Sequence, residues 1–177
     1  MKKNVMMIIL LLSYMAYAAT FPQVKTQNAE GDEFIFPQDA IQEGPALFAL
    51  AMSTNRKNGE VQQAELIAWQ EYFNAHEERT YQLKVYHFPV LASIPFFVKG
   101  AIRKGIGKSY ENLVPKERVA ILFISDVENF ADQAGIPLDE QSTLVLVKEQ
   151  GEIAGYIKGP PTEENLDALQ KLIWTLQ

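Results

Sequence analysis

Stretches typical of buried β-strands alternate with stretches typical of amphipathic helices along most of this chain. The first, ALFALAM at 46–52, is an apolar run ahead of a polar loop, and its length suits a strand buried on both faces. Strands are predicted at 46–52, 81–88, 119–124, 143–148 and 152–158, and helices at 60–74, 95–108, 125–134 and from 162 onward. This alternation predicts a three-layer α/β domain.

Turn and cap residues divide these stretches. Gly31-Asp32 splits residues 20–36 into a predicted N-terminal β-hairpin, and Gln150-Gly151 joins the last two strands into another. Helix caps are expected at Asn58, at Ser125 (with Glu128 completing a capping box) and at Thr162.

Residues 1–18 have the layout of a cleavable secretory signal. Lys2 and Lys3 supply the positive start, an apolar run follows at 5–12, and Ala16-Tyr17-Ala18 has the small residues that signal peptidase requires. The apolar run is shorter than the roughly 20 residues that span a bilayer, although a retained N-terminal anchor is the alternative. We expect cleavage after Ala18, export to a bacterial periplasm, and a single mature domain at 19–177.

The composition excludes several classes of function. The chain has no cysteine, so no disulfide can form and core packing alone must stabilise the fold. Its net charge is −6, and once Lys2 and Lys3 leave with the signal, 14 basic residues face 22 acidic ones, a net charge of −8. That balance argues against nucleic acid as a partner.

The layout resembles the thioredoxin superfamily, and more closely its peroxiredoxin-like and TlpA-like branch. The segment DVENFADQAGIPLDEQSTLVLVKEQGEIAGYIKGPPTEENLDAL (126–169) is similar to the ending of that branch, and 95–124 correspond to the helix and strand inserted before its final hairpin. Within this group, AELIAWQEYF (64–73) and VPKERVAILF (114–123) are similar to the thioredoxin-fold mitochondrial ATP synthase assembly factor and its bacterial counterparts. The resemblance implies a three-layer α/β/α domain with a central mixed sheet.

The chain departs from this family at the residues that react. The family's nucleophilic cysteine lies where the first core strand enters its helix, and this chain has the loop 53–59 there. The family's cis-proline, which faces that cysteine, corresponds to Ser142. No thiol oxidoreductase or peroxidase activity is therefore expected, and no catalytic residue is assigned. Ser53, Thr54, Asn55, Arg56 and Ser142 remain as a candidate docking surface.

A basic stretch forms a second candidate surface. On a helix over 96–109, Lys99 and Arg103 share one face by their spacing, as do Lys104 and Lys108. Such a helix could contact anionic lipid or an acidic partner segment. The alternative is that an apolar ridge of Val98, Ile102 and Ile106 packs on the sheet while the basic side chains are simply solvated.

No metal or cofactor site is predicted. His76 and His87 lack the spacing of a zinc site, and His87 is expected to be a hydrogen-bonded strand histidine. Ser53 and Thr54 lack the Gly-x-Ser-x-Gly surroundings of a nucleophile, so turn formation is their expected role. Trp69 and Trp174 are both expected in the core.

Three functions remain open at this point. The first is a redox-inactive, exported protein that binds another protein, as an assembly or chaperone-like factor. The second is a small-ligand carrier or an enzyme with a non-thiol site in the same cleft, which requires convergent polar groups. The third is a peripheral membrane protein that uses the basic helix.

Overall fold

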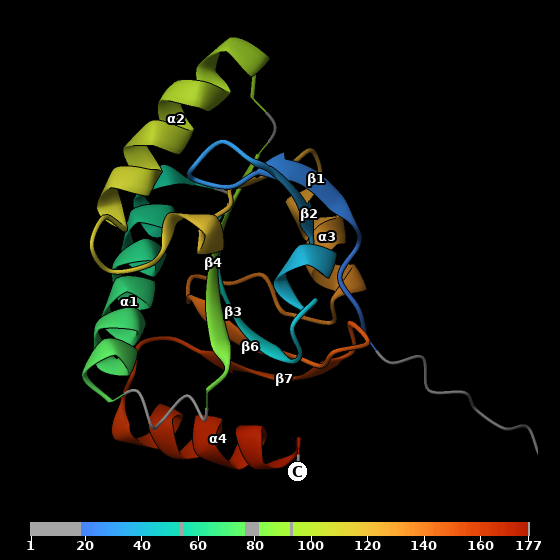
Figure 1. Cartoon of the computed structure of the whole chain (residues 1–177), viewed down its shortest axis with the longest axis vertical. Coiled ribbons are helices and arrows are strands. Elements are labelled where there is room, and N and C mark those ends of the chain that lie inside the picture. Colours follow the sequence, from blue (N-terminus) through green and yellow to red (C-terminus); the bar gives the residue numbers. More distant parts are fainter. Residues whose placement is uncertain (1–18, 54, 77–81, 93, 177) are drawn as a thin grey trace, which may run out of the picture.

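A five-stranded mixed sheet forms the centre of the protein, in the order β5-β4-β3-β6-β7 (Figure 1). The strands are β3 (Ala46–Met52), β4 (Lys84–Ala92), β5 (Leu122–Ile124), β6 (Thr143–Val147) and β7 (Ile153–Lys158). β3, β4 and β5 run parallel, whereas β6 is antiparallel to both β3 and β7. This computed structural model describes residues 19–53, 55–76, 82–92 and 94–176, so the predicted signal segment 1–18 lies outside the described residues.

Side chains alternate across β3, so this fully buried strand contributes to two cores. Leu47 and Ala49 belong to the core completed by α1 (Arg56–Ala75) and α4 (Glu163–Trp174). Phe48 and Leu50 belong to the opposite core, which the N-terminal segment and α3 (Val127–Gln133) complete. Both faces of the sheet are therefore covered. This confirms the predicted three-layer α/β/α fold with a central mixed sheet.

The predicted N-terminal hairpin is also confirmed. β1 (Val24–Gln27) and β2 (Glu33–Phe36) pair antiparallel, and the short η1 (Gln38–Ala40) follows them. The buried Asn28 holds the connecting loop, because its side-chain oxygen accepts hydrogen bonds from three successive backbone N–H groups, at 2.9–3.0 Å. The hydroxyl of Thr26 donates to the carbonyl oxygen of Ile121 at 2.6 Å, which fixes the hairpin beside the edge of the sheet.

The inserted helix α2 (Phe96–Ser109) runs beside α1 at the periphery of the molecule (Figure 1). Within this fully described helix no side chain is completely buried. The short η3 (Lys116–Arg118) and β5 follow it, as the helix-strand insertion predicts. Among the described residues, no helix is both long enough and apolar enough to cross a membrane.

The first helix begins earlier than predicted, and its cap is a different asparagine. Asn55 caps α1, because its side-chain oxygen accepts a hydrogen bond from the backbone N–H of Asn58 at 2.9 Å. Asn58 lies inside the helix and donates its amide to the carbonyl oxygen of Glu140 at 2.7 Å. Asparagine is a good cap at either position, so local sequence could not distinguish Asn55 from Asn58. The contact of Asn58 with the distant Glu140 fits its place inside the helix.

The end of β4 was also wrongly predicted, because Pro89 lies inside the strand. The carbonyl of His87, two residues earlier, accepts a hydrogen bond from Ala120 on the β5 side. Residues two apart point the same way, so the missing N–H of Pro89 faces β5 too. Regular pairing with β5 begins only at Val90, so the proline removes no hydrogen bond from a regular ladder.

Two further details needed correction. Asp126, rather than Ser125, caps α3, since its side-chain oxygen accepts from the N–H of Asn129 at 2.9 Å. Trp69 is 1% exposed, as expected of a core residue, but Trp174 is 52% exposed and lies outside the core.

Candidate functional site

The end of β3 enters α1 through the turn that contains the candidate residues 53–56. The hydroxyl of Ser53 accepts from the N–H of Asn55 at 3.1 Å and donates to the carbonyl oxygen of Asn55 at 2.7 Å. Both hydrogen bonds are local, so Ser53 has a structural role in this turn. Thr54, another candidate residue, lies outside the described residues.

We predict that replacing Asn55 with alanine lowers the free energy of unfolding by about 1 kcal/mol, because the cap of α1 is lost. Asn55→Asp keeps an oxygen acceptor and is expected to change stability by less than about 0.5 kcal/mol. Urea denaturation of the two variants measures the difference. Equal losses in both would show that the amide has some other role.

A groove of about 570 Å³ opens between this turn, the end of β4 and α2. Its apolar lining residues include Pro89, Val90, Leu91, Ile94, Ile102 and Ile106. Ser53, Asn55 and Arg56 line the end of the groove beside α1. Its volume falls within the range of about 300–1,000 Å³ that is usual for ligand pockets.

The charged groups of the groove neutralise each other. Among its described lining residues, the ionisable side chains are Arg56 and Glu60, whose Nε and Oε1 atoms lie 2.8 Å apart. The hydrogen bond and the charge of Glu60 raise the pKa of Arg56. The arrangement presents an apolar surface with a polar rim, which suits binding better than proton transfer.

Ser142 does not lie in this groove, which corrects its predicted position. The residue is 0% exposed, so a docked molecule could not reach it. Its N–H donates to a side-chain oxygen of Glu65 at 3.1 Å, and its carbonyl accepts from the N–H of Gly159 at 2.9 Å. Ser142 therefore connects α1 to the end of β7. A proline could not make the first of these hydrogen bonds.

Sequence reasoning missed Gln62, which connects α1 to the loop before β6. Gln62 is 0% exposed, and its side-chain nitrogen lies 3.1 Å from the carbonyl oxygens of both Met52 and Asp139. It lies 3.0 Å from the side-chain oxygen of Asn58. A glutamine among polar helix residues carries no signal of burial. Only its distance from Asp139 in the folded chain identifies its role.

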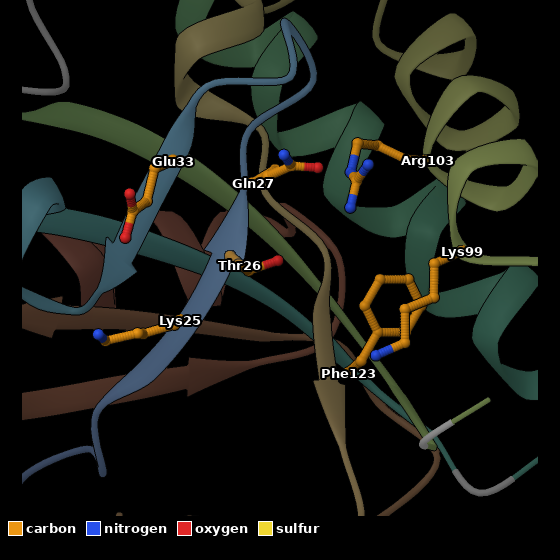
Figure 2. A pocket seen from close by; sticks show the side chains of 7 residues that line it. All are labelled: Lys25, Thr26, Gln27, Glu33, Lys99, Arg103 and Phe123. Atoms are coloured by element: carbon orange, nitrogen blue, oxygen red, sulfur yellow. The ribbon is translucent and has the colours of Figure 1, made fainter. Parts of the chain in front are cut away.

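The basic candidates lie on the other side of α2. Lys99 and Arg103 line a cleft of about 400 Å³ between α2 and β1, which Figure 2 shows. Arg103, Lys104 and Lys108 line a neighbouring cavity of about 370 Å³. The candidate residues therefore form two separate surfaces, with α2 between them.

The ridge predicted on α2 is only half-buried. Val98, Ile102 and Ile106 all keep part of their surface exposed. Ile106 packs against the small core of Tyr110, Val114 and Val119, and both Ile102 and Ile106 line the groove, so the ridge is only partly packed.

The contacts of the two histidines are not those of metal ligands. His87 is fully buried, and its Nε2 lies 2.9 Å from the side-chain oxygen of Gln70. His76 is exposed and stacks on Tyr72. Within the described part of the chain, no group of three histidine, aspartate or glutamate side chains could hold a metal ion.

Comparison with known proteins identifies the fold. No family model matches the chain, and no curated protein matches it. Among solved structures, it is similar to BsSco, a member of the Sco family of cytochrome c oxidase assembly proteins, at 14% identity and a TM-score of 0.57, over 91% of this chain and 96% of that one.

Two other structures show the same likeness. The peroxidoxin BcpB from Mycobacterium tuberculosis is 9% identical with a TM-score of 0.54, over 90% of this chain and 97% of that one. A thiol:disulfide interchange protein from Bacteroides sp. is 14% identical with a TM-score of 0.52, over 88% and 89% of the two chains. The chain therefore has a thioredoxin-like fold, as the resemblance predicted, and it has this fold without any cysteine.

Proposed function

We propose that this chain is a redox-inactive, thioredoxin-fold protein that binds an apolar segment of another protein in the groove between α1, β4 and α2. The observation that carries the proposal is the apolar groove of about 570 Å³ beside the end of β3. The resemblance to the thioredoxin family puts the reactive cysteine at this end of the fold. In this chain the groove lies at that end of the fold, and the cysteine is absent.

The chemistry of the groove supports binding over catalysis. Thiol exchange needs a thiolate, which this chain cannot supply. The ionisable side chains that line the groove, Arg56 and Glu60, form an exposed ion pair, whereas catalytic acids and bases usually lie in buried surroundings that tune them. An extended apolar segment would instead bury the half-exposed faces of Ile102 and Ile106.

The proposed place of action is a bacterial periplasm. The support is the layout of residues 1–18, with Lys2 and Lys3 ahead of an apolar run and Ala16-Tyr17-Ala18 at its end. An assembly or chaperone-like role fits a protein that binds others without reacting with them. The Sco family of cytochrome c oxidase assembly proteins is a precedent for assembly work by this fold.

Filling the groove tests the proposal. A Cβ added at Gly105, which lines the groove, or at Gly100, which does not, would meet no atom within 4 Å. We expect Gly105→Phe to weaken partner binding at least about tenfold, because the ring occupies the site. Gly100→Phe adds the same ring to the same helix and is expected to leave binding unchanged. The measurement is in-cell photocrosslinking from a photoreactive residue at Ile102.

The expected result is a discrete crosslinked protein that disappears with Gly105→Phe and persists with Gly100→Phe. Crosslinking that is equal in the two glycine variants would contradict the proposal. A small apolar molecule that copurifies and is displaced by Gly105→Phe would favour the carrier function instead, because the volume of the groove also suits such a ligand.

A further inference from the structure

The cleft between α2 and β1 is separate from the groove. It has a volume of about 400 Å³, and Thr26, Gln27, Lys99, Arg103 and Phe123 line it. Figure 2 shows the guanidinium of Arg103 directed into the space between the helix and the hairpin, towards the side-chain amide of Gln27. The hydroxyl of Thr26 already donates to Ile121, so the hairpin wall of the cleft is fixed.

Arg103 has an unused hydrogen-bond donor at this position. Its Nε is buried and has no hydrogen-bond partner among the described residues. A buried N–H without an acceptor costs about 1–3 kcal/mol, and more when the group is charged. Arg103 also lines the neighbouring cavity of about 370 Å³ with Lys104 and Lys108, so it lies at the centre of the basic surface.

The cleft has an excess of positive charge, since Lys25, Lys99 and Arg103 line it with one carboxylate, Glu33. Lys99, Arg103, Lys104 and Lys108 make no ion pair with any carboxylate in the described part of the chain. The ammonium of Lys99 lies 4.7 Å from the centre of the Phe123 ring, which holds it at the cleft. Glu33 also lines the cleft, but Figure 2 shows its carboxylate directed away from Arg103.

We propose that this cleft binds a phosphate group, with Arg103 as the principal ligand and Lys99 and Gln27 as further donors. The guanidinium fork matches the geometry of two phosphate oxygens, and the Lys99 ammonium acts as a point charge on a third. Gln27 is exposed, so its amide can rotate to present its NH₂ group. A carboxylate has two oxygens, which the fork alone would occupy, so phosphate uses the cleft more fully.

The phosphate could belong to a soluble molecule or to a phospholipid headgroup. Phe96 and Phe97, at the start of α2, are 84% and 74% exposed. The spacing of Phe96, Lys99 and Arg103 puts the three residues on one face of the helix. At an anionic membrane surface, Phe96 would enter the boundary of the acyl chains while the two cations meet headgroup phosphates.

The test measures binding of the purified protein to inorganic phosphate by calorimetry, and to vesicles by sedimentation. The vesicles contain phosphatidylglycerol in phosphatidylcholine, or phosphatidylcholine alone. We expect saturable binding that weakens at least about tenfold in the Lys99→Gln/Arg103→Gln double variant, because two charge-assisted contacts are lost. Arg103→Lys keeps the charge but loses the fork, and is expected to bind with intermediate affinity.

Lys171→Gln is the matched control, because Lys171 is an exposed lysine of α4 whose replacement removes one charge far from the cleft. Binding of free phosphate identifies a soluble source, and binding to the phosphatidylglycerol vesicles alone identifies a lipid headgroup. Each supports the proposal if the double variant loses the binding. The proposal is overturned if neither probe binds, if acetate competes as strongly as phosphate, or if the double variant binds as Lys171→Gln does. An acidic peptide that binds when both phosphate probes fail would also overturn it.

These variants leave the groove intact, since Lys99 and Arg103 do not line it. Circular dichroism checks that they fold, and no loss is expected because neither Lys99 nor Arg103 is a fully buried residue. Failure of the phosphate site would therefore leave the proposed protein-binding function untouched.

Discussion

Replacing Trp69 with alanine is expected to lower the free energy of unfolding by about 4–5 kcal/mol. The indole is 1% exposed and packs with Phe73, at 5.5 Å between ring centres, in the core that joins α1 and α4 to the sheet. Its Nε1 donates to the carbonyl oxygen of Gly159 at 2.9 Å. The substitution leaves a large cavity and a carbonyl without its partner. Most domains have only about 5–15 kcal/mol of stability to lose.

Two other variants make this prediction specific. Trp69→Phe keeps most of the volume but loses the hydrogen bond, and is expected to cost about 1–2 kcal/mol. Trp174→Ala removes the other tryptophan, which is 52% exposed, and should change stability by less than about 1 kcal/mol. Urea denaturation followed by far-ultraviolet circular dichroism measures all three. Similar losses from Trp69→Ala and Trp174→Ala would contradict the assignment of Trp69 to the core.

The stability of the protein is expected to fall as the pH is lowered from about 6.5 to about 3, because His87 is buried in its neutral form. Burial lowers the pKa of His87 from 6.5 to about 3. Between these values the unfolded chain binds a proton that the folded chain does not. The free energy of unfolding therefore decreases by up to about 1.4 kcal/mol for each unit of pH, and by about 4–5 kcal/mol over the whole interval.

A chain of hydrogen bonds determines which nitrogen of His87 carries the proton. The carbonyl oxygen of Leu113 can only accept, so the side-chain amide nitrogen of Asn74 faces it, at 3.0 Å. The oxygen of Asn74 then accepts from the amide nitrogen of Gln70 at 2.7 Å, which leaves the oxygen of Gln70 for His87 Nε2. Nε2 is therefore the protonated nitrogen.

The other ring nitrogen explains why a second proton is unfavourable. Nδ1 of His87 is buried and has no hydrogen-bond partner among the described residues. A proton added there would place an unpaired charge in the core. The ring of Tyr110 lies 4.7 Å from the His87 ring, and burial raises the pKa of Tyr110, so it stays neutral over this interval and offers no compensating charge.

The substitution His87→Gln tests this account, because glutamine keeps an N–H donor for Gln70 but does not titrate. The difference in unfolding free energy between the wild type and His87→Gln is expected to change with pH at about 1.4 kcal/mol per unit between pH 6 and pH 4. His76→Gln, at an exposed histidine, is the control. A parallel pH dependence of the wild type and His87→Gln would show that other groups cause the acid sensitivity.

Local sequence patterns predicted the order of the elements well. The apolar run Ala46–Met52 became β3 over the predicted residues, and Thr162 caps α4, as its side-chain oxygen accepts from the N–H of Asn165 at 3.2 Å. Gly151 adopts a φ of +85° in the turn between β6 and β7, which favours glycine. Each of these features depends on residues a few positions apart.

The face that α1 buries was less predictable. Val61, Ala64, Ala68 and Tyr72 recur at helical spacing, which predicts that they face the core. Val61 is nevertheless 49% exposed, whereas Gln62 and Gln70 are buried with Leu66, Trp69 and Phe73. Gln62 is buried because Met52 and Asp139 lie within hydrogen-bond distance of it, and Gln70 because His87 does. Hydropathy cannot predict such burial, since the polar partners come from other elements.

The sequence by itself determined the alternation of strands and helices, the cap of the last helix, the turn of the last hairpin and the lack of any thiol chemistry. Periodicity, turn residues and composition can be read without knowing how the chain packs. Only the tertiary structure decided that Ser142 is buried, that α2 has an apolar groove on one side and a basic cleft on the other, and that Arg103 faces β1. These features depend on how distant segments pack together. A helix pattern states which residues share a face, but not what lies opposite that face.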